Sequence, residues 1–261
     1  PEQEIAESQV DPEDATTTEI EEETQQAEPE ELTEEVGPAE QEEATEGDPY
    51  VLFQDDKGND VFTNAGQTNA INRMKEWWQS DEKMFVLAGR GGTGKTTIVD
   101  KTLDELKVDK NGVIIALPTH KALQVIEEIT QGSAGDYMTL ASLLGLEKKW
   151  NSEKREYEFI QSVDKYAKNL KNFEAQGVEL IVVDEVSMVT EQQAIQLVQL
   201  TKSKNEGGLG LKIIFMGDNV QLPPIEDSKS NIGLSTIFDN VMGFNNKANL
   251  GINPDNYVKL T

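Results

Sequence analysis

The chain has 261 residues and a formal net charge of −26, from 49 Asp or Glu against 23 Lys or Arg. It contains no cysteine and one histidine, which excludes a disulfide framework, a thiolate metal site and a conventional zinc centre, and suits a cytoplasmic protein. No apolar run approaches the ~20 residues that a membrane span needs, so no membrane partner is expected.

The acidity is concentrated at the start of the chain. Residues 1–48 contain 20 Asp or Glu and no Lys or Arg, which leaves a charge of only −6 for residues 49–261. This first segment is rich in Glu, Thr, Gln and Pro and poor in aliphatic residues, so we predict a disordered acidic tail with a domain boundary near residue 48. Two roles stay open for the tail: a solvated linker, or an acidic arm that binds a basic surface of a protein partner or of the chain itself.

Beyond the tail, apolar runs of strand length alternate with amphipathic segments. Near-continuous apolar runs are typical of strands buried on both faces, and they predict strands at 84–89, 112–117, 179–185 and 212–218. Helices are predicted at 67–80, 96–107, 121–131 and 191–203. This alternation predicts an α/β fold, a parallel sheet with helices on both faces, whose functional residues lie beyond the carboxyl ends of the strands.

A phosphate-binding loop follows the first of these strands. The sequence Gly-Arg-Gly-Gly-Thr-Gly-Lys-Thr at 89–96 fits the pattern GxxxxGK[ST] between a strand and a helix, the context that this motif requires. Backbone N–H groups would surround the phosphates of ATP, Lys95 would reach the β- and γ-phosphates, and Thr96 would bind Mg²⁺. The residues predicted to hold the nucleotide here are Gly89, Gly91, Gly92, Thr93, Gly94, Lys95, Thr96 and Thr97.

Two further motifs follow later strands. Asp184 and Glu185 end the apolar run LIVVDE, where Asp184 would hold Mg²⁺ and Glu185 would orient and deprotonate the attacking water. Residues 217–224, GDNVQLPP, follow the next strand, and Gln221 is the candidate sensor of the γ-phosphate. Taken alone, the acidic pair could equally well be a strand cap, and residues 217–224 could equally well be a Pro-stiffened surface loop. With the upstream loop, they predict catalysis by Lys95, Asp184, Glu185 and Gln221.

The three motifs and their order resemble the superfamily 1 helicases, in particular the RecD-like and Dda-like branch, from about residue 62 to 261. The resemblance implies a P-loop NTPase of RecA-like fold that moves five-prime to three-prime on single-stranded DNA. It also implies that Gln67 contacts adenine. Single-stranded DNA would be contacted by residues of two further motifs, although Ala141 stands where the family usually has histidine; these residues are Pro118, Thr119, His120, Thr139 and Ser142.

A β-hairpin insertion is predicted at about 146–162, around a turn at 151–154. In the family that the chain resembles, a hairpin here separates the duplex with an aromatic side chain, which makes Trp150, Tyr157 and Phe159 candidates. Aromatic faces stack on bases and nearby lysines attract phosphate. The alternative is an ordinary amphipathic hairpin whose aromatic side chains pack on the domain.

The resemblance also implies a second RecA-like domain in the same longer chain, which supplies arginines to the γ-phosphate. The sequence begins with Pro1 rather than Met, and its last residues, 257–261, resemble the start of the segment that carries the first of those arginines. We therefore expect a helicase of DNA replication or repair, for which a phage is one compatible source, and we expect this segment alone to hydrolyse ATP slowly. Two alternatives stay open: an ATPase that does not translocate, and an inactive P-loop domain that serves a larger assembly through its acidic tail.

Overall fold

The computed structural model describes residues 47–129, 134–153, 155–221, 236–243 and 248–261. Residues 43–261 form one compact unit. The predicted acidic tail lies almost wholly outside the described residues, as do Lys154 of the predicted hairpin turn and the two prolines at 223–224. None of the helices in the described part combines the length and the apolar character that crossing a bilayer requires.

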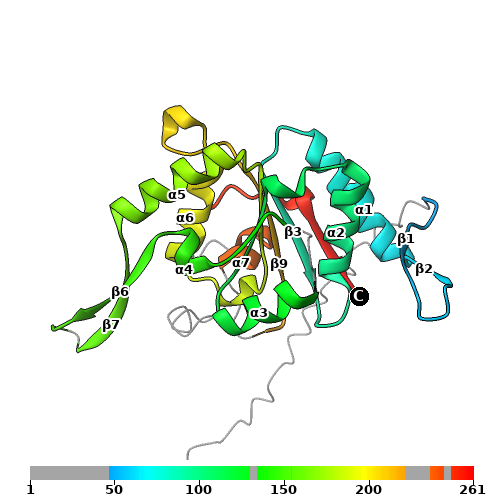
Figure 1. The fold of residues 1–261 in the computed structure, drawn as a ribbon, viewed down its shortest axis with the longest axis horizontal. Coiled ribbons are helices and arrows are strands. Elements are labelled where there is room, and N and C mark those ends of the chain that lie inside the picture. The colour runs from blue at the N-terminus through cyan, green and yellow to red at the C-terminus, as the bar shows by residue number, and fades with distance from the viewer. Residues whose placement is uncertain (1–46, 130–133, 154, 222–235, 244–247) are drawn as a thin grey trace, which may run out of the picture. The chain divides into compact units, whose positions relative to one another are not determined.

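The core of this unit is a six-stranded sheet in which every neighbouring pair is parallel (Figure 1). All four predicted strands are present, and strands β5 and β10 add an edge on either side of them. Strands far apart in the chain are neighbours, so the carboxyl ends of β3, β9 and β8 lie side by side. The order across the sheet is β10 (Tyr257–Leu260), β3 (Met84–Gly89), β9 (Lys212–Gly217), β8 (Leu180–Val183), β4 (Val113–Leu117) and β5 (Asp136–Thr139).

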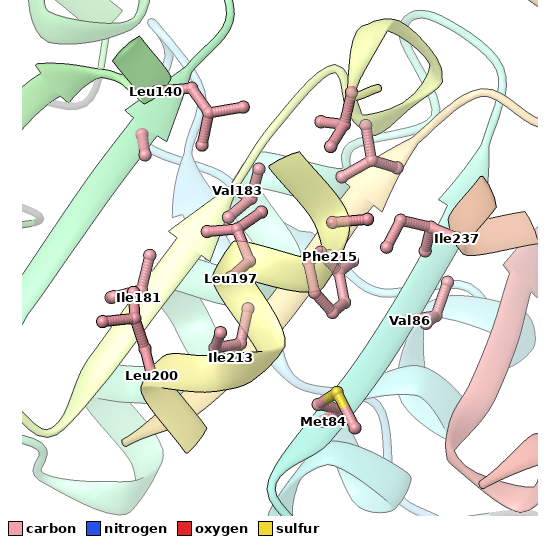
Figure 2. Packing of buried hydrophobic residues seen from close by; sticks show 14 of the residues in the cluster. Met84, Val86, Leu140, Ile181, Val183, Leu197, Leu200, Ile213, Phe215 and Ile237 are labelled. Atoms are coloured by element: carbon pink, nitrogen blue, oxygen red, sulfur yellow. The ribbon is translucent and has the colours of Figure 1, made fainter. Parts of the chain in front are cut away.

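Helices cover both faces of the sheet, as the sequence predicts, because successive side chains of each strand point to opposite faces. Phe85 and Leu87 of β3 pack with buried residues of α1 and α2. Met84 and Val86 point to the other face, where they pack with residues of α6 and α7 such as Leu197 and Ile237 (Figure 2). The first face carries α1 (Ala65–Gln79), α2 (Lys95–Leu106) and α3 (His120–Ile129). The second carries α4 (Leu140–Leu143), α5 (Val163–Gln176), α6 (Glu191–Thr201) and α7 (Thr236–Val241).

Smaller elements complete the unit. An antiparallel pair, β1 (Val51–Gln54) and β2 (Asp60–Phe62), precedes α1, and a second pair, β6 (Leu146–Asn151) and β7 (Glu156–Gln161), is inserted between α4 and α5. The second pair is the predicted hairpin, and Figure 1 shows it extending away from the sheet. Short 3-10 helices are η1 (Lys110–Gly112), η2 (Val186–Met188), η3 (Lys204–Glu206) and η5 (Pro254–Asn256).

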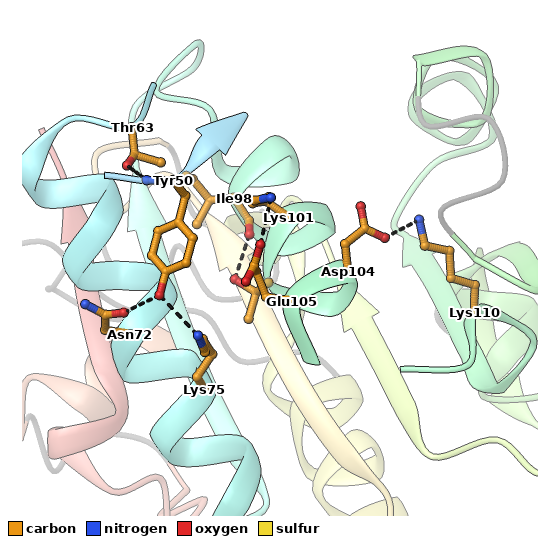
Figure 3. A network of polar contacts seen from close by, with 10 residues as sticks. Tyr50, Thr63, Asn72, Lys75, Ile98, Lys101, Asp104, Glu105 and Lys110 are labelled. Atoms are coloured by element: carbon orange, nitrogen blue, oxygen red, sulfur yellow. Dashed lines mark hydrogen bonds and ion pairs between the residues drawn. The ribbon is translucent and has the colours of Figure 1, made fainter. Parts of the chain in front are cut away.

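Side-chain hydrogen bonds fix α1, which precedes β3 and contacts the phosphate loop through Gln67. Its first turn has a capping box, in which Asn64 accepts from the backbone N–H of Gln67 and the Gln67 side chain accepts from the backbone N–H of Asn64. Tyr50 connects the segment before β1 to the helix, since its hydroxyl donates to Oδ1 of Asn72 at 2.7 Å and accepts from Nζ of Lys75 at 3.1 Å (Figure 3). The position of α1 is therefore set at its start and along its length.

The other end of α1 is held by Lys212, the first residue of β9. Its ammonium group donates to the carbonyl oxygens of Trp77 at 3.1 Å, Ser80 at 2.8 Å and Glu82 at 2.6 Å, and lies 4.7 Å from the centroid of the Trp77 ring. Carbonyl groups at a helix C-terminus lack partners within the helix, and a cation stabilises them. One side chain thus joins a surface helix to a central strand.

Lys212→Met is expected to lower the free energy of unfolding by roughly 1.5–3 kcal/mol, the usual contribution of hydrogen bonds from a charged group. Methionine keeps much of the aliphatic stem and removes the donor. Urea unfolding followed by circular dichroism measures the change, with Lys171→Met, at an exposed position of α5, as the matched control. Equal unfolding midpoints for the two variants would show that the carbonyl contacts contribute nothing.

Candidate functional site

The phosphate loop joins β3 to α2 at the carboxyl edge of the sheet. Gly92 and Gly94 have φ of 79° and 86°, a left-handed conformation that a side chain strains, and a Cβ at Gly91 or Gly92 would meet no atom within 4 Å. No side chain caps the start of α2 at Gly94. The N–H groups of the first turn of α2 are therefore available to an anion, whereas the N–H of Thr93 in the loop donates to the carbonyl of Arg90 at 3.3 Å.

Polar contacts hold the loop together. The ammonium group of Lys95 donates to the carbonyl oxygens of Gly89 at 2.7 Å and Arg90 at 3.1 Å, and the hydroxyl of Thr93 donates to Arg90 at 2.9 Å. Nε2 of Gln67 donates to the carbonyl of Thr93 at 3.2 Å. Gln67, expected to contact adenine, thus lies against the phosphate loop, and the adenine contact itself stays a prediction.

The carboxylates of Asp184 and Glu185 lie just beyond β8. The sequence placed them inside the strand, which is wrong by two residues, because the backbone turns at Glu185 with a φ of 54°. Oδ1 of Asp184 accepts from the backbone N–H of Glu185 at 2.7 Å. Burial raises the pKa of Asp184, against the opposing effects of that hydrogen bond and of Lys95. Burial, and then the charge of Asp184, raise the pKa of Glu185, which makes it a stronger base.

The predicted Mg²⁺ ligands come together. Thr96 and Asp184 both border one small cavity between α2 and the sheet, whose lining is almost entirely apolar, so the two residues lie near each other beside the phosphate loop. Within the described residues, no group of three or more His, Cys, Asp or Glu could hold a metal by itself. Mg²⁺ suits such a partial set, since it binds through one or two protein oxygens, substrate phosphates and waters. The residues present therefore fit a nucleotide-bound Mg²⁺.

Gln221 lies in the turn after β9, next to β8. The turn is shaped by Asp218, whose Oδ1 accepts from the N–H of Val220 at 2.9 Å and whose carbonyl accepts from the N–H of Gln221 at 3.2 Å. The hydroxyl of Ser187 donates to Oε1 of Gln221 at 3.0 Å. Ser187 was not among the predicted site residues, because only the fold brings it to Gln221.

A glycine allows the turns after β8 and β9 to meet. A Cβ on Gly217 would lie 2.8 Å from Cγ2 of Val186 and 3.2 Å from its backbone nitrogen. Val186 directly follows Glu185 and is buried. Any side chain at 217 therefore pushes on the turn that carries the candidate base.

Gly217→Ala is expected to lower the free energy of unfolding by about 1–3 kcal/mol, the usual cost of overpacking a close contact. Thermal unfolding measures the loss. Gly66→Ala is the matched control, because a Cβ there has Asn64 as its nearest neighbour at 3.5 Å, an ordinary contact, and glycine is a poor helix former. An unchanged melting temperature for Gly217→Ala would contradict the close packing.

The predicted DNA contacts follow β4 and β5, at the same edge of the sheet. His120 and Ser142 are exposed, while Pro118 and Thr119 are partly exposed. Thr139 differs, since it is buried, caps α4 and donates its hydroxyl to Ser142 at 2.9 Å. The buried position of Thr139 disfavours a direct contact with DNA. Its hydrogen bond at the start of α4 suits Thr139 to positioning the Ser142 side chain instead.

The register of the β6–β7 hairpin separates its side chains into two faces. Lys148 pairs with Phe159 and Trp150 pairs with Tyr157, so these four lie on one face, and the three aromatic residues are 55–60% exposed. The opposite face carries Glu147, Lys149, Glu158 and Ile160 in the same register. The rings of Trp150 and Tyr157 are 5.0 Å apart, and Nζ of Lys148 lies 4.6 Å from the Tyr157 ring centroid. Burial of these aromatic side chains on the domain, the alternative interpretation, is therefore wrong.

A parallel sheet with a phosphate loop, two acidic residues and a polar turn at one edge defines a P-loop nucleotide-binding domain. Residues 67–227 match the AAA domain family, AAA_19, and the chain belongs to this family. Membership implies nucleotide binding. The prediction of a RecA-like domain of superfamily 1 helicases, related to RecD and Dda, is confirmed by this match and by the relatives described next.

The chain is 32% identical over 190 residues to an uncharacterized protein of Acanthamoeba polyphaga mimivirus, and the aligned region covers 68% of this chain and 36% of that protein. It is 26% identical over 174 residues to the ATP-dependent DNA helicase dda of Enterobacteria phage T4, covering 66% and 35%. The RecBCD enzyme subunit RecD of Buchnera aphidicola is 31% identical over 163 residues, covering 56% and 24%. The chain thus spans between 24% and 36% of the length of these relatives.

Among solved structures, the Pif1 helicase from Candida albicans aligns with a TM-score of 0.48 at 16% identity, covering 77% of this chain and 39% of that chain. Bacteroides sp Pif1 in complex with ADP-AlF4 aligns with a TM-score of 0.43 at 22% identity, covering 74% and 41%.

Proposed function

We propose that this chain is the ATP-binding motor domain of a helicase that moves on single-stranded DNA. The observation that carries the proposal is the meeting, at one edge of the sheet, of the phosphate loop, the acidic pair and the turn that carries Gln221. In superfamily 1 relatives such a domain belongs to a helicase, and the phage T4 relative is an ATP-dependent DNA helicase.

Each residue has a role in the proposed reaction. The phosphate loop and Lys95 bind the triphosphate, and Gln67 orients the loop and contacts adenine. Thr96 and Asp184 would hold Mg²⁺, which would neutralise charge on the β- and γ-phosphates. Glu185 removes a proton from the attacking water, and Gln221 donates a hydrogen bond to the γ-phosphate.

The proposal extends to partners outside the described residues. A second RecA-like domain of the same longer polypeptide supplies arginines to the γ-phosphate, which typically contributes a factor of about 10³ or more to hydrolysis. The acidic segment 1–48 binds a basic protein surface. A viral setting is supported by the mimivirus and phage T4 relatives. A role in DNA replication or repair is part of the proposal, as the use of a DNA helicase.

The test is steady-state ATP hydrolysis by the longest natural polypeptide that contains this segment, with and without single-stranded DNA. Strong stimulation by DNA is the expected result, and single-stranded RNA at equal phosphate concentration establishes the preference for DNA. Hydrolysis that is equal with and without nucleic acid would identify an ATPase that does not translocate. The absence of hydrolysis under all conditions would show that the chain is not the motor domain of an active helicase.

Phe159→Ala is expected to weaken binding of single-stranded DNA by roughly 5- to 100-fold, the range for loss of one aromatic stacking partner. Fluorescence anisotropy with a labelled oligonucleotide measures the affinity. Phe53→Ala is the matched control, because Phe53 also lies in a two-stranded pair and is 53% exposed against 55% for Phe159. Equal affinities for both variants would show that the aromatic face of the hairpin does not bind bases.

A further inference from the structure

Ser187 and Gln221 form a contact between the turn after β8 and the turn after β9. They are 34 residues apart, and the hydroxyl of Ser187 donates to Oε1 of Gln221 at 3.0 Å. Ser187 is 1% exposed, whereas Gln221 is exposed. A buried donor therefore holds the carbonyl end of an exposed amide.

The Ser187 side of this contact is rigid. Ser187 is the middle residue of η2, where the N–H of Met188 donates to the carbonyl of Glu185 at 2.9 Å and the N–H of Val189 donates to Val186 at 3.1 Å. Val186 packs closely on Gly217 at the end of β9. Glu185 directly precedes this short helix as its N-cap, so the candidate base and the donor to Gln221 belong to one rigid turn.

The polarity of the contact decides what Gln221 can offer to a ligand. A glutamine amide has one acceptor oxygen and a nitrogen with two donor hydrogens. Since the hydroxyl of Ser187 occupies the oxygen, the nitrogen is left to face outward. A phosphate oxygen accepts hydrogen bonds and does not donate them, so only this orientation suits the γ-phosphate.

We infer that Ser187 is a positioning residue, which orients the amide of Gln221 so that its nitrogen faces the γ-phosphate of bound ATP. The inference rests on the proposed function, and it adds that discrimination between ATP and ADP depends on a side chain that touches neither. Ser187 lies two residues after Glu185 in the same turn, so the residue that orients the γ-phosphate sensor and the candidate base for water activation are held by one structural element.

The test compares the affinities of the full chain for ADP and for a non-hydrolysable ATP analogue, by competition with a fluorescent nucleotide. Ser187→Ala is expected to lower the preference for the ATP analogue by about three- to tenfold, the effect of one hydrogen bond, with unchanged affinity for ADP. Gln221→Met, at an exposed position, is expected to lower it equally. The double variant is expected to show no additional loss, because both changes remove the same interaction.

Ser162→Ala is the matched control, since the Ser162 side chain makes no capping hydrogen bond at the start of α5. If Ser187→Ala binds neither nucleotide, Ser187→Cys, with nearly the same volume and a weak donor, takes its place with a smaller expected loss. A wild-type preference that survives in all Ser187 variants, or additive losses in the double variant, overturns the inference while the proposed function stands. A wild-type chain that binds neither nucleotide overturns both.

Discussion

Lys95→Ala is expected to reduce ATP hydrolysis by the longer polypeptide at least about 100-fold, the usual effect of removing one donor that stabilises developing charge. The ammonium group lies at the loop, 2.7 Å from the carbonyl of Gly89, and its charge offsets part of the rise in the pKa of Asp184 that burial causes. Alanine removes both the positive charge that faces the phosphates and a contact that holds the loop closed. Affinity for ATP is expected to fall as well.

The hydrolysis assay with and without single-stranded DNA measures this effect. Lys101→Ala is the matched control, because Lys101 lies on the same helix, where it pairs with Glu105 at 2.8 Å away from the loop. Equal hydrolysis by the two variants would mean that any ATPase activity of the preparation does not come from this site. Loss in Lys95→Ala alone would assign the activity to the phosphate loop.

The central strands could be predicted because burial on both faces leaves a simple signature in the sequence. In β3, β4 and β8 every residue is buried, and the chain shows uninterrupted apolar runs there. The phosphate loop could be predicted for a related reason, since its glycines and Lys95 follow a fixed local pattern. Both signals lie within about ten residues along the chain, where sequence patterns are informative.

Other elements could not be predicted because their stability comes from distant contacts. Strand β5 has four residues, of which only Thr139 is buried, and β10 lies at the opposite edge of the sheet with alternating exposure. These two strands form at the edges of a sheet that the central strands define. Helix α5 differs, because Tyr166, Leu170 and Phe173 recur at helical spacing and pack on the core, so its amphipathic pattern could have been predicted and was missed.

The site shows the same division between local and distant signals. Asp184 and Gln221 could be proposed from their places after apolar runs, but the link through Ser187 depends on β8 and β9 being neighbours. The two faces of the hairpin depend on its register, in which Trp150 pairs with Tyr157. A shift of one residue would move every aromatic side chain to the other face. The sequence thus predicts which residues react and leaves open which ones position them.

Asp184→Asn is expected to stabilise the nucleotide-free domain at pH 7 while abolishing Mg²⁺-dependent hydrolysis. Burial raises the pKa of Asp184 above its ordinary value, so the folded state favours the protonated carboxyl. Stability from this group is therefore fully present at pH values below its unfolded-state pKa, and it is lost as the pH rises through the folded-state pKa. At neutral pH the ionised, buried carboxylate opposes folding, and asparagine removes that charge while its oxygen still accepts from the N–H of Glu185.

The expected gain at pH 7 is roughly 0.5–2 kcal/mol, the range typical of single stabilising changes, and it shrinks towards zero in acid. Thermal unfolding at pH 7 and pH 4 measures it, with Asp56→Asn, at an exposed position between β1 and β2, as the control. Adding Mg²⁺ and ATP analogue should reverse the order, because binding stabilises the wild type and asparagine is a poor ligand. A melting temperature of Asp184→Asn below that of the wild type at pH 7 would show that the carboxylate stabilises the fold, and that its burial serves the structure and not the metal.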